Sequence, residues 1–229
     1  MATQGEILAD VRSRLDEASA RQWSDEELLR WMNEGLRDVA RRAEVLQTVE
    51  NISAVTGTQQ YDMPSRTIRV HRVEWRPDGS TQVYPLTYQD FHNMDSVWVA
   101  SQETSRGYPL YYTMWGYPPS LKIVLYPTPS MDGVIKVYYY TLPTPLEIDG
   151  SDSDSDVNLP TGWEDVIALY VEYVAMRKDA DPRWQEAKNL YEESLGDLMD
   201  VTRRWTDQAG MISTETGLLP QWLYGGQAW

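Results

Sequence analysis

The two ends of the chain carry apolar residues at the spacing of α-helices. Near the N-terminus one run passes through Ile7 and Val11, and a longer run passes through Leu28 and Val39 to about Ala43. Residues three and four positions apart share one helix face, so each run presents an apolar side. The N-terminal region therefore predicts a pair of amphipathic helices.

Two more helical runs follow residue 160. The first, Val166 to Val174, is apolar on nearly every face, which is typical of a helix that is buried or wedged between subunits. The second has Asp181 as its cap and Pro182 at its first position, where the missing N–H is harmless. Its large apolar residues repeat every seven positions and predict a seam against another helix. The seam consists of Trp184, Tyr191, Leu198 and Trp205, with Ala187, Leu190 and Val201 beside them.

A serine or threonine followed three residues later by glutamate marks three of the predicted helix starts. In this capping box the two side chains satisfy backbone N–H groups that the first helical turn leaves free. The pattern occurs at Thr3/Glu6, Ser24/Glu27 and Thr161/Glu164.

Residues 46–160 hold nearly all the prolines and predict short strands separated by turns. Leu86–Met94 is expected to form a short helix between two of these strands. Strands at such spacing favour an antiparallel sandwich or a small barrel. The candidate strands are Leu46–Ala54, Gln59–Asp62, Ile68–Trp75, Gln82–Pro85, Tyr111–Trp115, Leu121–Tyr126 and Val134–Tyr140.

The fold class that follows is α+β. Residues 1–45 and 161–205 are expected to form one discontinuous α-helical bundle from the N- and C-terminal helix pairs. Residues 46–160 form a central antiparallel β sandwich or barrel-like insertion, and residues 206–229 form an extended C-terminal arm.

The arm is short, poor in charge, and rich in glycine, proline and large aromatic residues. Leaving such aromatic side chains in water is unfavourable, since burying each one stabilises by about 1.5–3 kcal/mol. We therefore expect the arm to dock into the chain's own body, a sister subunit or a partner. Its anchors would be Leu219, Trp222, Tyr224 and Trp229.

Aromatic composition narrows the possibilities further. The chain has 15 tyrosines and 10 tryptophans against a single phenylalanine, Phe91. Such residues join apolar area to a polar group and are enriched at interfaces. A subunit interface, an aromatic core and a sugar-stacking surface all fit this composition. For the interface, the candidates are Tyr170, Tyr173, Trp184, Tyr191 and Trp205.

The net charge is −15, and residues 141–229 alone carry 17 acidic against 6 basic residues. A protein that grips duplex DNA presents clustered lysine and arginine to the phosphates, so this balance argues against one. It suits a conduit through which DNA slides without sticking. Residues 1–10 lack the features of a signal peptide and no apolar run could span a bilayer, so we expect a soluble protein made in the cytosol.

No catalytic constellation emerges, so neither an enzyme nor a cofactor is expected. Cysteine is absent, and the two histidines, His71 and His92, have neither metal spacing nor a nucleophile nearby. A weak candidate for a calcium site is the loop with Asp152, Asp154 and Asp156, because hard cations prefer alternating oxygen ligands. It lacks the glycine and glutamate of an EF-hand, which favours a solvated loop. The basic cluster Arg37, Arg41 and Arg42 fits the negative end of a helix dipole better than a phosphate site.

Three stretches resemble the head-to-tail adaptor proteins of tailed phages, in the style of podovirus adaptors. The first is residues 21–35 (RQWSDEELLRWMNEG), at the start of the second helix. The next is residues 56–64 (TGTQQYDMP), ahead of a strand with Val70 and Val73. The last is Leu159-Pro160 ahead of a helix that carries Tyr170 and Tyr173. The similarity covers roughly residues 4–205 in layout.

The resemblance implies a virion structural protein of the neck, assembled in the bacterial host cytoplasm. Twelve copies would form a ring under the portal protein, with helices around a DNA channel and the β portion facing tail or nozzle proteins. DNA would pass without sequence-specific binding, and no membrane would be involved. C-terminal segments of adaptors reach onto the portal, which would make Leu219, Trp222, Tyr224 and Trp229 docking anchors.

Two alternatives stay open at this point. One is another neck protein, such as a stopper bound below an adaptor. The other is a glycan-binding module of a phage tail that uses aromatic platforms, namely Trp75, Trp98, Tyr111, Tyr112 and Trp115.

Overall fold

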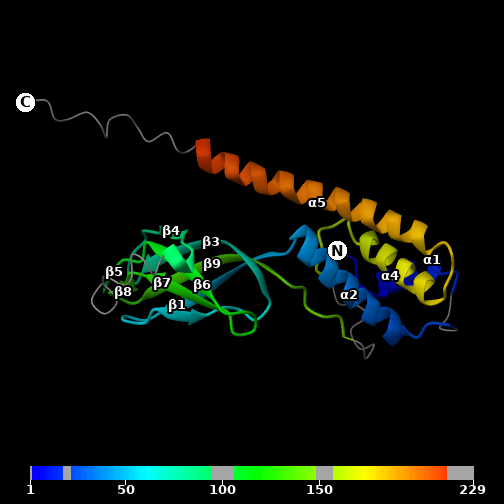
Figure 1. Cartoon of the computed structure of the whole chain (residues 1–229), viewed down its shortest axis with the longest axis horizontal. Helices are drawn as coiled ribbons and strands as arrows, with labels where there is room; N and C mark the ends of the chain where they lie inside the picture. Colours follow the sequence, from blue (N-terminus) through cyan, green and yellow to red (C-terminus); the bar gives the residue numbers. More distant parts are fainter. Residues whose placement is uncertain (1, 18–21, 94–105, 148–156, 216–229) are drawn as a thin grey trace, which may run out of the picture. The chain divides into compact units, whose positions relative to one another are not determined.

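The computed structural model describes residues 2–17, 22–93, 106–147 and 157–215, with side chains described up to residue 204 (Figure 1). The chain divides into two compact units. The helical unit comprises Met1–Val45 and Thr144–Trp229, and the β unit comprises Leu46–Pro143. The fold class is α+β, as predicted.

The helical unit is built around one central helix. It contains α1 (Gln4–Arg14), α2 (Asp25–Ala43), α4 (Asp165–Lys178) and α5 (Trp184–Glu215). Helix α4, yellow in Figure 1, packs against α1, α2 and α5. Every residue of α4 from Val166 to Met176 is buried or half-buried. Its apolar surface is therefore covered by helices of its own chain.

Two of the three predicted caps form. The Thr3 hydroxyl accepts a hydrogen bond from the Glu6 N–H at 3.2 Å, and Glu6 accepts one from the Thr3 N–H at 2.9 Å. Ser24 caps α2 by accepting a hydrogen bond from the Glu27 N–H. These bonds satisfy donors that the first turn of each helix leaves free.

The predicted cap at Thr161 is wrong. Gly162 adopts a positive φ of 91°, so the chain turns there and α4 begins only at Asp165. Glu164 accepts hydrogen bonds from the N–H groups of Gly162 and Ala2 instead of reaching back to Thr161. Thr161 and Glu164 have the spacing of a capping box, but the turn at Gly162 separates Thr161 from the first turn of α4.

Helix α5 starts two residues later than expected, at Trp184. Asp181 still accepts a hydrogen bond from the Arg183 N–H at 2.9 Å, ahead of the first turn. The predicted heptad residues Tyr191 and Leu198 are buried, whereas Leu190, predicted beside them, is 48% exposed. Trp184 and Val201 are half-buried, and Trp205 lies beyond the described side chains. The buried seam consists of Ala187, Tyr191, Leu195, Leu198 and Thr202.

The β unit contains a seven-stranded sheet that curls into a nearly closed barrel. Its strand order is β1-β9-β3-β4-β6-β7-β2, and the two-residue strands β5 and β8 pair separately. The bounds are β1 Gln47–Ala54, β2 Gln60–Asp62, β3 Thr67–Pro77, β4 Tyr84–Tyr88, β5 Arg106–Gly107, β6 Tyr111–Trp115, β7 Lys122–Tyr126, β8 Thr128–Pro129 and β9 Gly133–Thr141.

All pairs in the large sheet are antiparallel except β4 with β6. These two strands are joined by residues 89–110, a connection long enough to return the chain in the same direction. The helix predicted over Leu86–Met94 is wrong for Leu86–Tyr88, which end β4. Helical structure is confined to residues 91–93 in the described part of this segment.

Gly133 permits the closest approach in the barrel core. A Cβ at this position would lie 2.5 Å from the Arg76 carbonyl oxygen and 2.6 Å from the ring of Trp75. Trp75 is fully buried, so its ring has no free space to move into. Glycine is required here because the β9 backbone lies against a large side chain.

We expect Gly133→Ala to lower the free energy of unfolding by about 1–3 kcal/mol, the usual effect of overpacking a core. Gly196→Ala is the matched control, because nothing lies within 4 Å of a Cβ on that exposed position of α5. It should stabilise the protein by about 0.5–1 kcal/mol. Urea denaturation followed by circular dichroism measures both. Equal effects of the two variants would contradict the packing argument.

Candidate functional site

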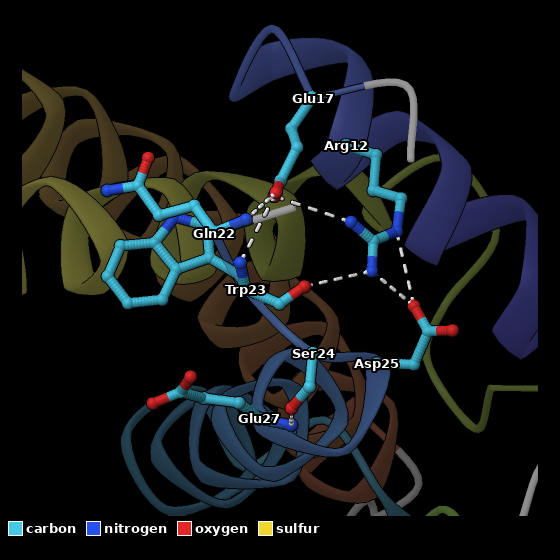
Figure 2. Close-up of polar contacts among 7 residues, drawn as sticks. All are labelled: Arg12, Glu17, Gln22, Trp23, Ser24, Asp25 and Glu27. Atoms are coloured by element: carbon cyan, nitrogen blue, oxygen red, sulfur yellow. Dashed lines mark hydrogen bonds and ion pairs between the residues drawn. The ribbon is translucent and has the colours of Figure 1, made fainter. Parts of the chain in front are cut away.

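The corner between α1 and α2 contains the most buried charged cluster described in the helical unit (Figure 2). Glu17, only 8% exposed, accepts hydrogen bonds from the N–H groups of Gln22 and Trp23. The Arg12 guanidinium binds Glu17 at 3.4 Å and also binds Asp25. It donates a further hydrogen bond to the Trp23 carbonyl oxygen at 3.2 Å. This network fixes the path of the chain from α1 into α2.

Two tryptophans form the apolar side of the same corner. The rings of Trp23 and Trp31 meet edge to face, with centroids 5.2 Å apart. The Lys178 ammonium lies 5.0 Å from the Trp23 ring centroid and 5.4 Å from that of Trp31, and it pairs with Glu27. A cation over aromatic faces adds to the ion pair. The end of α4 is thereby fastened to the start of α2.

Gly35 also has a structural role within residues 21–35. A Cβ there would lie 2.8 Å from Cδ1 of Tyr170, so the glycine lets α2 and α4 approach closely. The stretch that carries the adaptor resemblance thus contributes a turn network, an aromatic pair and a close helix contact. Sequence reasoning missed the roles of Arg12, Glu17 and Gly35. Only the isolated glycine within a helical pattern could have signalled one of them.

Three of the five residues predicted for a subunit interface pack on one another within a single chain. The ring centroid of Tyr170 lies 5.7 Å from that of Tyr173 and 5.2 Å from that of Tyr191. Tyr173 and Tyr191 stack with centroids 6.4 Å apart. Tyr191, on α5, is buried, while Tyr170 and Tyr173, on α4, are half-buried. An interface role for Tyr170, Tyr173, Trp184, Tyr191 and Trp205 stays a prediction.

Polar contacts extend from this tyrosine cluster to α2. The Tyr191 hydroxyl donates a hydrogen bond of 2.6 Å to Asp38. Arg42 binds both carboxylate oxygens of Glu192, at 3.2 and 2.5 Å, and approaches Asp38 at 3.4 Å. Burial raises the pKa of Tyr191, and the hydrogen bond to Asp38 raises it further. Burial also raises the pKa of Tyr170, to about 12. Both hydroxyls stay protonated at neutral pH, so they act as hydrogen-bonding and packing groups.

The aromatic residues of the β unit divide into core and surface. Trp75 is fully buried and Tyr112 is 6% exposed, so neither can stack on a sugar. This corrects the expectation that they form a platform, and the reason is that both face the inside of the barrel. Tyr111 is half-buried, and Trp98 lies outside the described residues. Trp115 is 55% exposed and packs on Phe91, with ring centroids 4.9 Å apart.

The histidines and the candidate metal ligands form no catalytic or metal site among the described residues. His71 lines a shallow hollow of about 510 Å³ with Tyr88, Tyr112 and Met114, and its ring meets that of Tyr140 edge to face. No group of histidine and carboxylate side chains suited to a metal ion occurs within the described ranges. The candidate ligands Asp152, Asp154 and Asp156 lie outside those ranges.

The comparison with known families identifies one family for the chain. The model of the SU10 adaptor protein family matches residues 2–213. The chain belongs to this family. The match runs through both units and includes each stretch on which the resemblance to phage adaptors rests, so that resemblance is confirmed. No curated protein matches the chain.

As an SU10 adaptor, the chain is a structural protein of the phage virion neck that interacts with portal and tail proteins. None of the helices in the described segments is both long and apolar enough to cross a membrane. The arm residues Leu219, Trp222, Tyr224 and Trp229 lie beyond the matched residues and outside the described ones.

We expect Glu17→Ala in this SU10 adaptor to lower the free energy of unfolding by about 3 kcal/mol, because it leaves the largely buried Arg12 without its nearest buried partner. Asp25→Ala removes the exposed partner of the same arginine and should lower it by about 1 kcal/mol or less. Urea denaturation followed by circular dichroism compares the two. The buried network would be rejected if Asp25→Ala proved the more damaging change.

Proposed function

We propose that this adaptor forms a ring of twelve copies beneath the portal, extends the DNA channel and provides the platform to which the tail attaches. The observation that carries the proposal is the family match through both units. The helical unit would surround the channel and the β unit would face tail components, as the resemblance implies. Assembly would take place in the host cytoplasm.

The distribution of charge between the two units supports this arrangement. Residues 1–45 and 144–229 carry 27 acidic and 13 basic residues, whereas residues 46–143 carry 8 acidic and 7 basic ones. The helical unit therefore holds nearly the whole net charge of the chain. A strongly negative wall repels phosphates and would let DNA move past without sequence-specific contacts.

The exposed aromatic residues of the β unit support a contact with tail proteins. Tyr88 is 54% exposed, Trp115 is 55% exposed and Tyr117 is 86% exposed. Tyrosine and tryptophan are enriched where proteins bind one another. Because Trp75 and Tyr112 are buried, the β unit exposes fewer of the aromatic residues that the sequence suggested for glycan binding.

The C-terminal arm is proposed to dock on the portal through Leu219, Trp222, Tyr224 and Trp229. Deleting residues 218–229 should abolish binding to the portal and leave the thermal unfolding transition unchanged, because the proposal assigns the anchors of this segment to the portal and not to the core of the chain. Pull-down with purified portal measures the binding. Twelve copies per portal are expected by native mass spectrometry.

A milder pair of variants tests the anchors themselves. Trp222→Ala with Trp229→Ala should weaken portal binding at least about tenfold, as loss of aromatic anchors does. Gln221→Ala with Gln227→Ala alters the same segment without removing apolar area and should bind normally. Unchanged binding of the tryptophan variant would reject the arm model. Binding only when another neck protein is already on the portal would identify a stopper instead of an adaptor.

A further inference from the structure

Helix α2 carries a stripe of arginines on the side opposite its buried face. Arg30, Arg37 and Arg41 follow one another at intervals of seven and four residues, and all three are exposed. This spacing aligns them on one face of the helix. Among the described residues, none of the three has an ion pair or hydrogen bond. We name these residues the basic stripe.

Helix α5 carries a stripe of the opposite sign. Glu186, Glu193, Asp197 and Asp200 follow at intervals of seven, four and three residues and are all exposed. They lie on the face opposite the seam that contains Tyr191, so they point away from the core of the unit. None of the four forms an ion pair with any described residue. We name these residues the acidic stripe.

Several other charged residues of the helical unit have partners within the chain. Arg14 pairs with Asp10 and Arg42 with Asp38, each four residues apart. Arg12 and Lys178 also have carboxylate partners. In the stripes, Arg37/Arg41 and Glu193/Asp197 are like charges four residues apart, and Arg30 forms no ion pair with Glu26 or Glu34, although each stands four residues from it.

The helix dipole accounts for only part of the pattern. Arg41 lies in the last turn of α2 and Glu186 in the first turn of α5, where these signs of charge are favourable. Arg30 and Arg37 lie in the interior of α2, and Glu193, Asp197 and Asp200 lie in the interior of α5. The dipole effect fades within one turn of each end, so it does not account for these five charges.

We propose that the basic stripe of one copy binds the acidic stripe of the next copy in the ring. This inference rests on the proposed function, since a closed ring requires heterologous contacts in which each copy offers two different, complementary faces. The two stripes also match in length. By helical rise, residues 30–41 span about 16 Å and residues 186–200 about 21 Å.

A second copy explains both stripes, whereas channel DNA explains only one. Phosphates would attract Arg30, Arg37 and Arg41 but would leave the acidic stripe of α5 without a partner. Each exposed ion pair is weak and is screened by salt. Repetition around a ring adds the weak contacts together, so association should weaken as ionic strength rises.

Charge reversal tests the contact on the full chain. Arg30, Arg37 and Arg41 are changed to glutamate in one variant, and Glu193, Asp197 and Asp200 are changed to lysine in another. Each alone should associate on the portal at least about tenfold more weakly than the unmodified chain, because like charges then face one another. An equimolar mixture of the two should regain association, since each variant then meets an oppositely charged neighbour. Sedimentation of the portal complex measures association.

The matched control for the basic-stripe variant changes Arg177, Lys188 and Arg203 to glutamate, which lowers the net charge by the same amount at exposed positions outside both stripes. This control should assemble like the unmodified chain. Loss of association in the control as well, or no recovery in the mixture, would overturn the stripe contact. A basic-stripe variant that assembles normally but changes DNA passage would assign Arg30, Arg37 and Arg41 to DNA and also overturn it.

Disulfide trapping supplies a readout that survives if charge reversal disturbs folding. The chain has no cysteine, so Arg37→Cys in one preparation and Asp197→Cys in another introduce single thiols. Mixed on the portal and oxidised, they should form cross-linked dimers. Arg37→Cys mixed with Lys188→Cys, on another face of α5, should not. If the unmodified chain binds the portal and no cross-link forms, only the stripe contact fails; if it does not bind the portal, the proposed function fails.

Discussion

The enclosure of α4 is the constraint on which the helical unit depends. Nearly every position of this helix is apolar, so it must be covered on all sides to leave water. Its covering helices come from both ends of the chain, α1 and α2 from one and α5 from the other. The bundle is therefore discontinuous in sequence. The β unit occupies the interval between Val45 and Thr144 as an insertion with its own core, centred on Trp75.

Polar contacts then select one arrangement of these helices. Hydrophobic burial is not directional, and it would tolerate small rotations of α2 or α5. The Arg12–Glu17 network fixes the α1–α2 corner, and the hydrogen bond from Tyr191 to Asp38 fixes α5 against α2. Asn33 exchanges two hydrogen bonds with the backbone of Leu146 and holds the returning chain on α2. Residues 21–35, which resemble phage adaptors, thus contribute packing and turn contacts.

The sequence predicted the helices and strands that local periodicity determines, and it missed the contacts between residues far apart in the chain. The turn residues between the strands and the apolar faces of α1 and α2 place most elements correctly. The Thr161 cap failed because Gly162 turns the chain first, and Leu190 is exposed because it lies to one side of the buried seam, in which Tyr191 and Leu198 keep the predicted spacing of seven. The parallel β4–β6 pair and the Arg12–Glu17 pair join residues whose proximity no spacing reveals. Burial of Trp75 follows from the barrel closing around it.

Because the core of the helical unit is closed within one chain, attraction between copies depends on its exposed side chains. An apolar helix such as α4 could have offered a buried face to a neighbour, but its surface is already used within the chain. The tyrosine cluster is likewise engaged by its own partners, with Tyr191 2% exposed. What the described part of the helical unit leaves without ion pairs includes the basic stripe of α2 and the acidic stripe of α5. A ring held by such pairs would form readily when copies are gathered on a portal and hold weakly when they are not, because multivalency multiplies contacts that are individually small.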